Sequence, residues 1–335
     1  MILEKIKKYK RLLPLLSGVL IILSFPPFNL GFMAWFALLP LLASFYYDDF
    51  CMGFEKGFFY GAVINLGILY WLSVNQGAQW YFSTLSMISS VLFLALFYGL
   101  AGALLGYIGR RSGYFLTVLA FPFVFSGLEW LRSLGVLGFS WNHLCYTQAA
   151  FLPVMQMVAF TGPFGLGLWV YFLNSLIFLT IIEWQTSGKR LLGIFLIVFI
   201  FPWIFGLLVL TGADKDFDEN INNMLTVTVV QPNVDPNEKW DNGLYEANMD
   251  SLFALSRREI KAHGSELVVW PETAVPTYLR INRRNSLYDI NEFTRSYSVA
   301  IITGAPDYEL NEEKEYEFYN SVFFLTPATP RPKSY

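Results

Sequence analysis

Residues 266–276 read ELVVWPETAVP, and this stretch decides how the C-terminal part of the chain folds. Its apolar run, residues 267–270, predicts a short buried strand, which Pro271 ends because proline cannot donate the next hydrogen bond of a sheet. Glu272 is therefore expected at the carboxyl end of a strand, where a rigid sheet often aims catalytic carboxylates into the crevice beyond it. Glu272 is the candidate catalytic residue; the alternative is a surface glutamate that follows a proline.

The segments on either side of this strand alternate between strand and helix patterns. In chain order, we expect a strand at 224–230, a helix at 241–263, the ELVVW strand, a helix at 285–297, a strand at 299–306 and a final strand at 320–327. Gly264 is the expected stop of the first helix. This order predicts a layered α/β domain with helices packed on a sheet.

The preceding part of the chain has the composition of a membrane protein. Of the 335 residues, 55% are hydrophobic, 18% are aromatic and only 15% are charged. A soluble domain has about 25% charged residues. Charged residues are sparse from Leu12 to Gly212 and frequent from Ala213 onward. We therefore expect a transmembrane helical domain at 1–212 and a water-exposed domain at 213–335.

Seven membrane spans are expected in the first domain. The first apolar run, residues 12–25, meets Pro26-Pro27 instead of a small-residue cleavage site, so we expect it to be retained as a span. It is short for a span of about 20 residues. The other six spans are expected near 30–47, 57–74, 85–108, 114–131, 162–182 and 191–211.

The positions of the basic residues predict the orientation, because cytoplasmic loops retain positive charge. The basic tail and alternate gaps between spans hold Lys5, Lys7, Lys8, Lys10, Arg11, Lys56, Arg110, Arg111, Lys189 and Arg190. The opposite gaps hold almost no lysine or arginine, apart from Arg132 at a helix end. The N-terminus is thus expected in the cytoplasm, and an odd number of spans places residues after 212 on the outer side.

Several other features have two readings or exclude a class of function. Glu129 and Arg132 are spaced to pair on one helix face, or they extend to the membrane interface at a helix end. The net charge of −3 predicts no nucleic-acid partner. The cysteines Cys51 and Cys145, like the two histidines, form no metal-ligand pattern. We expect no metal and no cofactor.

Four outer-domain stretches and two membrane stretches resemble one known family. They are residues 227–241 (VTVVQPNVDPNEKWD), ELVVWPETAVP, VAIITGAPDY, YNSVFFLTP, SFPPF at 24–28, and residues 139–170. Together they resemble the apolipoprotein N-acyltransferase family, which joins a membrane bundle to a nitrilase-like domain. The resemblance implies a polytopic α-helical membrane domain followed by an incomplete α/β nitrilase-like domain, an αββα sandwich.

The family's catalytic residues are a glutamate, a lysine and a cysteine, in that chain order. Glu272 matches the glutamate, which would act as general base, and Trp240 matches a tryptophan that would bind substrate at the acyl entrance or brace its loop. The lysine is expected two residues beyond Tyr335, and Lys333 is a poor substitute. Cys145 precedes Glu272 and is expected to be a buried apolar residue. We therefore expect a C-terminally truncated member that is inactive as given.

For the family, the resemblance implies transfer of a phospholipid acyl chain through a thioester enzyme to the N-terminal diacylglyceryl-cysteine of lipoproteins. The implied partners are a phospholipid donor, a diacylglyceryl apolipoprotein acceptor and membrane lipid, in the bacterial inner membrane with the C-terminal domain in the periplasm. Two alternatives remain open. One is a membrane-tethered nitrilase-like amidase acting on a small amide, and the other is a non-catalytic membrane scaffold or transporter.

Overall fold

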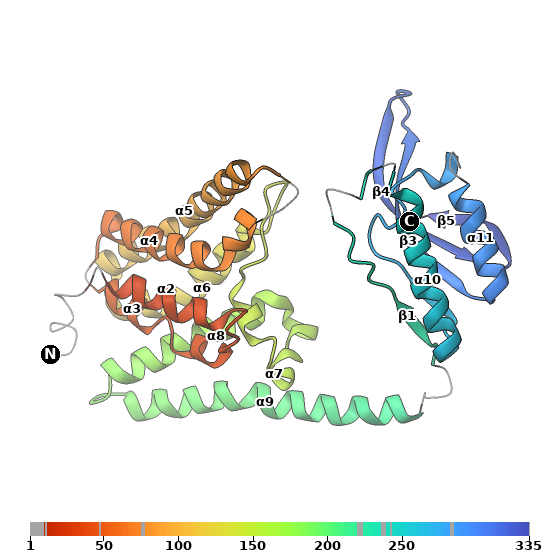
Figure 1. Ribbon diagram of the computed structural model, residues 1–335. Coiled ribbons are helices and arrows are strands. Elements are labelled where there is room, and N and C mark those ends of the chain that lie inside the picture. The colour runs from red at the N-terminus through yellow and green to blue at the C-terminus, as the bar shows by residue number, and fades with distance from the viewer. Residues whose placement is uncertain are drawn as a thin grey trace. The chain divides into compact units, whose positions relative to one another are not determined.

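The computed structural model describes residues 10, 12–46, 48–74, 78–219, 224–235, 239–241, 243–281 and 285–334, without the side chains of 213–219 and 329–333 (Figure 1). The tail residues Lys5, Lys7, Lys8 and Arg11, which entered the orientation prediction, lie outside the described residues, as do Tyr335 and the side chain of Lys333. The chain divides into two compact units, Met1–Phe217 and Asp218–Tyr335.

The described part of the first unit consists of helices and the turns and loops that connect them. Its elements are α2 (Leu13–Ser24), η2 (Gly31–Trp35), α3 (Leu39–Ser44), α4 (Phe50–Leu69), η3 (Tyr70–Val74), α5 (Trp80–Ser112), α6 (Tyr114–Arg132), η4 (Leu144–Gln148), α7 (Leu152–Met155), α8 (Val158–Ile182) and α9 (Gly188–Glu219). Five helical segments among the described residues are long and apolar enough to cross a membrane: Phe50–Val74, Trp80–Ser112, Tyr114–Arg132, Val158–Ile182 and Gly188–Gly212.

The first two of the seven expected spans are shorter than a membrane requires. Helix α2 has 12 residues, about 18 Å at 1.5 Å per residue, whereas the hydrocarbon core is about 30 Å thick. The second expected span, at 30–47, is broken into η2 and α3. The helix α3 begins at Leu39 with Pro40 in its first turn, where the missing N–H of proline costs no helical hydrogen bond.

Helices α4 and α5 pack closely because glycines face each other across their contact. A Cβ added at Gly53 would lie 2.2 Å from the carbonyl oxygen of Gly102, and one added at Gly102 would lie 2.2 Å from the carbonyl oxygen of Gly53. Only residues without a side chain allow this approach of the two backbones. The glycine-rich run at 99–109 therefore serves ordinary helix packing.

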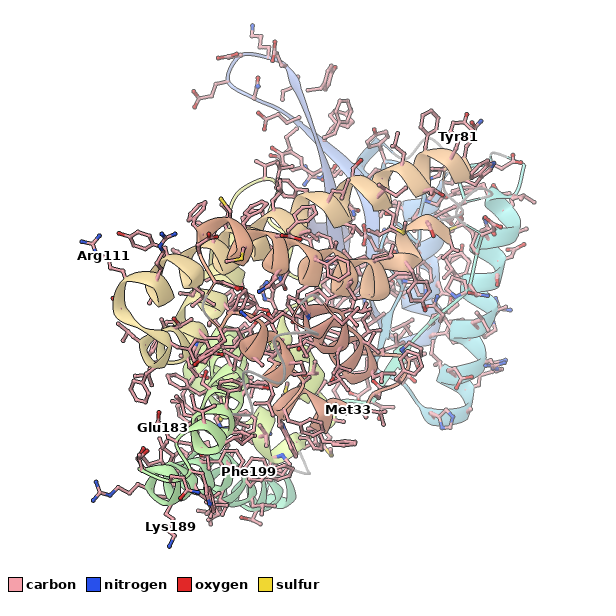
Figure 2. The ribbon with its side chains drawn as sticks, turned by 90° about the vertical axis from the view of Figure 1, so that its left-hand side faces the viewer. Met33, Tyr81, Arg111, Glu183, Lys189 and Phe199 are labelled. Atoms are coloured by element: carbon pink, nitrogen blue, oxygen red, sulfur yellow. The ribbon has the colours of Figure 1, made fainter. Side chains whose placement is uncertain are left out.

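A buried ion pair holds the beginning of α4 against the preceding turn. The Nζ atom of Lys56 lies 2.5 Å from Oδ2 of Asp48 and donates to the carbonyl oxygen of Ser44 at 2.6 Å. Lys56 was expected in a gap before a span, but α4 begins at Phe50 and includes it. The pairs Arg110-Arg111 and Lys189-Arg190 are instead exposed at helix ends, and Arg111 and Lys189 point away from the helices (Figure 2).

The second unit is a five-stranded sheet with two long helices. Its elements are β1 (Val227–Val229), α10 (Tyr245–His263), β2 (Leu267–Val269), η6 (Leu279–Ile281), α11 (Ser286–Tyr297), β3 (Ala300–Leu310), β4 (Tyr316–Thr326) and β5 (Thr329–Ser334). The strand order is β1-β2-β3-β4-β5, with parallel pairing from β1 to β3 and antiparallel pairing from β3 to β5. The predicted alternation of strands and helices is confirmed, and Gly264 ends α10 in the left-handed region with φ 66°.

One expectation about the sheet is wrong. The stretch NSVFFLTP was expected to be the final strand, but β5 follows it and pairs with β4. The two prolines of β5 obscured its strand pattern, since proline is confined to strand edges and bulges. In this unit α10 and α11 cover one face of the sheet, and their Leu252, Ile290 and Phe293 join Val268 and Ile301 in its buried core.

Candidate functional site

The chain at Glu272 is fixed by the strand that precedes it. The backbone N–H of Trp270 donates to the carbonyl oxygen of Ile302 in β3 at 2.8 Å. The indole N–H of the same residue donates to Oγ of Ser256 in α10 at 2.9 Å, and the Trp270 side chain is only 2% exposed. The end of β2 is thus clamped to the neighbouring strand and to a helix. Glu272 follows two residues later, at the carboxyl end of β2, and its side chain is exposed.

A glycine of β3 lets the backbone of Glu272 approach the sheet. A Cβ added at Gly304 would lie 2.5 Å from the backbone nitrogen of Thr273 and 2.8 Å from Cα of Glu272. The backbone N–H of Gly304 donates to the carbonyl oxygen of Pro271 at 3.4 Å. The backbone N–H of Val275 donates to the carbonyl oxygen of Gly304 at 3.3 Å. Thr273 has a φ of 50°, a left-handed conformation that is strained for a β-branched residue. The turn that presents Glu272 therefore depends on the missing side chain at 304.

Asn320 is the side chain that holds the carboxylate. Its Nδ2 donates to Oε1 of Glu272, and its Oδ1 accepts a long hydrogen bond of 3.5 Å from Oγ1 of Thr273. In the antiparallel register of β3 and β4, Asn320 lies opposite Pro306. Sequence reasoning missed Asn320 as a site residue, although it begins the expected NSVFFLTP strand. The sequence signal that could have identified Asn320 is its polar amide at the start of an otherwise apolar strand.

The loop after β1 brings a lysine to the same turn. The Nζ atom of Lys239 donates to the backbone carbonyl oxygen of Glu272 at 3.0 Å. Lys239 therefore steadies the main chain at Glu272 and was not predicted to do so. The neighbouring Trp240, the predicted substrate-binding residue, is 60% exposed.

A pocket of about 130 Å³ adjoins Glu272 on the side of this loop. Described residues of three segments line it: Gln231, Pro232, Asn233, Val234, Lys239, Asn248, Leu252, Pro271, Glu272, Ala274 and Pro276. Trp240 is not among these described lining residues. The pocket offers one carboxylate, one ammonium group and several amides, so it can bind a polar group beside the carboxylate of Glu272.

Neither cysteine belongs to the unit that carries Glu272. Cys51 is exposed in α4, and Cys145 is buried in η4, where burial raises the pKa of its thiol to about 12. A thiol with this pKa stays protonated near neutral pH, as expected for a buried apolar residue. Among the residues the structure describes, no three His, Cys, Asp or Glu side chains are grouped so that they could hold a metal ion.

The expectation that Glu129 and Arg132 extend to the interface is wrong, because each is only 2% exposed. Nor do they hydrogen-bond to each other. Oε1 of Glu129 accepts from the backbone N–H of Leu144 and from the hydroxyl of Tyr171, both at 3.0 Å. An Nη1 hydrogen of Arg132 is donated to the hydroxyl of Tyr98 at 3.1 Å. Both side chains thus tie α6 to the interior of the first unit.

Comparisons with known proteins identify relatives of both units. The family described as Apolipoprotein N-acyltransferase N-terminal domain matches residues 17–176. The apolipoprotein N-acyltransferase of Geobacter metallireducens is 30% identical over 335 residues, which cover 97% of this chain and 62% of that protein. The corresponding enzyme of Chlorobaculum tepidum is 29% identical over 338 residues, covering 94% of this chain and 61% of that protein.

A third relative, the apolipoprotein N-acyltransferase of Brucella melitensis biotype 1, is 28% identical and is covered to 60% of its length. The chain therefore spans about three fifths of the length of these curated relatives. The matches extend through the helical unit and through the sheet that carries Glu272. The chain is thus similar to apolipoprotein N-acyltransferases over almost its whole length.

Proposed function

We propose that this chain provides the membrane domain and the glutamate-bearing part of an enzyme that transfers an acyl chain from a phospholipid to the N-terminal diacylglyceryl-cysteine of lipoproteins. The observation that carries the proposal is the placement of Glu272 at the carboxyl end of β2, with one carboxylate oxygen held by Asn320. A carboxylate with one oxygen fixed and the other available is suited to accept a proton. The names of the relatives supply the class of reaction.

In the proposed reaction, Glu272 accepts the proton of a cysteine thiol as the sulfur attacks the ester carbonyl of a phospholipid. The C–S bond forms, the ester C–O bond breaks, and the lysophospholipid leaves with a proton. The α-amine of the acceptor then attacks the thioester, so that the C–N bond forms, the C–S bond breaks and the thiol is restored. Covalent catalysis of this kind divides one difficult transfer into two easier ones.

This chemistry needs two groups in addition to those described around Glu272. One is the thiol, because Cys51 and Cys145 both belong to the first unit. The other is a cation for the tetrahedral oxyanion. Lys239 already donates to the backbone carbonyl oxygen of Glu272. We therefore assign Lys239 to positioning the turn, and we propose that the described residues alone do not complete a turnover.

The proposed fold of the second unit is one half of a nitrilase-like αββα sandwich. Its helices cover the sheet face that carries Val268, Ile301 and Phe323. On the opposite face, Val322 is 45% exposed and the described part of this unit provides no covering layer there. In an αββα sandwich, each sheet has helices on one face and the second sheet on the other. A sheet with helices on one face and an open apolar face fits one helix layer and one sheet layer of such a sandwich.

We also propose that Trp240 contacts the acyl substrate. Its side chain is 60% exposed, which favours a binding role over the bracing of its loop. Exposed tryptophans suit the boundary between water and lipid, because the indole ring is apolar on its faces and polar at its N–H. Replacing Trp240 by alanine should therefore weaken acyl-donor binding without lowering the melting temperature.

The proposed orientation places the N-terminus in the cytoplasm and the second unit in the periplasm of the inner membrane. Five spans and seven spans both give this result, because both numbers are odd. The exposed pairs Arg110-Arg111 and Lys189-Arg190 support it, since each lies at a helix end on the predicted inner side. A second unit in the periplasm would be on the side where lipoprotein precursors expose their acylated N-terminus.

The proposed function is tested in proteoliposomes that contain the product of the full reading frame carrying these residues. We expect N-acylation of a diacylglyceryl-cysteine peptide when phospholipid is the only acyl donor. Hydrolysis of soluble amides without any need for phospholipid would favour the amidase alternative. Neither activity, in a correctly folded protein, would favour a scaffold and overturn the proposal.

A further inference from the structure

The antiparallel pairing of β3 and β4 forms a long hairpin, residues 306–320, that extends from the sheet of the second unit (Figure 1). In such a pair, directly opposite residues and residues two apart share one face. The opposite pairs are Pro306 with Asn320, Tyr308 with Phe318, and Leu310 with Tyr316. These six residues therefore form one face, which we call the aromatic face of the hairpin.

The outer part of the aromatic face is an exposed apolar surface. The ring centroids of Tyr308 and Tyr316 are 5.3 Å apart, and Tyr278 packs edge-on against Tyr308 at the same distance. Phe318 is 69% exposed, Tyr316 is 61% exposed and Leu310 is 59% exposed. Exposed apolar side chains that lie next to one another indicate an interaction surface, whereas single scattered ones do not.

The opposite face of the hairpin is charged and already engaged. Its pairs are Asp307 with Tyr319 and Glu309 with Glu317. Arg280 lies 3.1 Å from Oδ2 of Asp307 and 3.3 Å from Oε1 of Glu309. The hydroxyl of Tyr319 donates to Oε2 of Glu317 at 2.6 Å. The hairpin is thus amphipathic across its two faces.

The aromatic face leads directly to the candidate site. Asn320, at the base of this face, is the residue that donates to Glu272. Phe318 and Tyr316 follow at about 7 and 13 Å along the same strand, at about 3.3 Å per residue. Any surface that covers the aromatic face is therefore adjacent to the carboxylate.

We propose that the aromatic face lies in the headgroup region of the lipid bilayer and thereby presents Glu272 to membrane-embedded molecules. Tyrosine and phenylalanine are suited to this region, and the second unit follows directly on α9, whose apolar part Gly188–Gly212 is long enough to span the membrane. A bilayer surface is therefore always within reach of this unit. The statement about Glu272 rests on the proposed function, whereas the lipid contact of the hairpin does not.

The charge of the hairpin specifies which lipid surface it contacts. Six carboxylates lie on its tip and charged face, against Lys314 of the hairpin and the neighbouring Arg280: Asp307, Glu309, Glu312, Glu313, Glu315 and Glu317. Carboxylates are repelled by anionic headgroups within about one Debye length, roughly 8 Å at physiological salt. The contact is therefore with zwitterionic lipid, and its depth decreases when anionic lipid is added.

The test places a nitroxide label at single cysteines in this chain, with Cys51 replaced by serine and Cys145 by alanine, in vesicles of zwitterionic phosphatidylcholine. The labelled variants are Tyr316→Cys and Phe318→Cys on the aromatic face, with Glu309→Cys and Glu317→Cys as matched controls on the charged face. Collisions with oxygen, which concentrates in lipid, and with a water-soluble nickel chelate are measured at each site.

We expect high oxygen and low nickel collision rates at 316 and 318, and the reverse at 309 and 317. High nickel rates on both faces would show a hairpin in water, and low rates of both reagents at 316 and 318 would show a face covered by protein; either result overturns the proposal. Acyl transfer by the full reading-frame product, measured separately, decides the proposed function. Loss of that activity with the alternating collision pattern intact would contradict only the proposed function.

Discussion

Asn320 donates a side-chain hydrogen bond to Glu272 although 48 residues separate them in the sequence. The contact exists because β3 pairs with both β2 and β4, which brings the carboxyl end of β2 and the first half of β4 to the same end of the sheet. Glu272 is thus held by a strand that follows it in the chain. Its position depends on the register of the whole sheet.

Replacing Asn320 by alanine should slow acyl transfer in the full reading-frame product. A hydrogen bond to a charged group contributes about 1.5–3 kcal/mol, and loss of about 1.4 kcal/mol corresponds to a tenfold lower rate. We expect kcat to fall about tenfold with little change in the melting temperature. Tyr319→Phe is the matched control, because its hydroxyl donates to Glu317 on the other face. Equal rates in the two variants would remove Asn320 from the site.

Replacing Gly304 by alanine should displace the turn that carries Glu272. The added Cβ would lie 2.5 Å from the backbone nitrogen of Thr273, so the backbone must move. Overpacking of this kind typically costs about 1–3 kcal/mol. We expect a lower melting temperature and a loss of transfer. Gly243→Ala is the control, because its nearest atom would be 3.4 Å away; the account of the turn is contradicted if both variants behave alike.

Much of the second unit was predictable because its patterns are local. The helix at 285–297 agrees with α11, and the ELVVW strand agrees with β2, to within a few residues. The helices of the membrane unit were harder to predict, because a hydrophobic run does not show where its helix is interrupted. The run at 30–47 looked like a span, yet it contains a 3₁₀ turn and a short helix separated by non-helical residues.

The candidate site was predictable only in part. Glu272 could be found from the proline that ends its strand, which is a local signal. The contribution of Asn320 depends on strand pairing, and that of Gly304 depends on a close approach of two backbones. Neither can be predicted from the sequence around Glu272. The positions of Glu129 and Arg132 were predicted wrongly for a related reason, since their hydrogen-bond partners lie in other helices.

Truncating Glu129 should destabilise the first unit. Glu129→Ala would leave the N–H of Leu144 and the hydroxyl of Tyr171 without their acceptor in a buried position. An unsatisfied buried polar group costs about 1–3 kcal/mol. Glu129→Gln keeps an acceptor oxygen and should lose less. Thermal unfolding in detergent measures both, with the exposed Glu55→Gln as control; three equal melting temperatures would count against the buried role.

The stability of the first unit should fall between pH 6.5 and 4 through His143, which lies in the connection between α6 and α8. Burial, and secondly the charge of Arg132, lowers the pKa of His143 from 6.5 to about 4. The unfolded state therefore binds the proton first as the pH falls, so the free energy of unfolding decreases across this window and levels off below it. His143→Gln should show a shallower decrease by chemical unfolding. Parallel curves for the two proteins would contradict this.

Formation of the acyl-enzyme tests most directly the proposal that Glu272 is the base that activates the thiol. The full reading-frame product and its Glu272→Gln variant are incubated with phospholipid, and the mass of the protein is measured for an added acyl group. Glu266→Gln, six residues earlier and also exposed, is the control. We predict an acyl adduct in the unmodified protein and in the control, and none in Glu272→Gln. Adduct levels in Glu272→Gln that equal those of the unmodified protein would contradict the account.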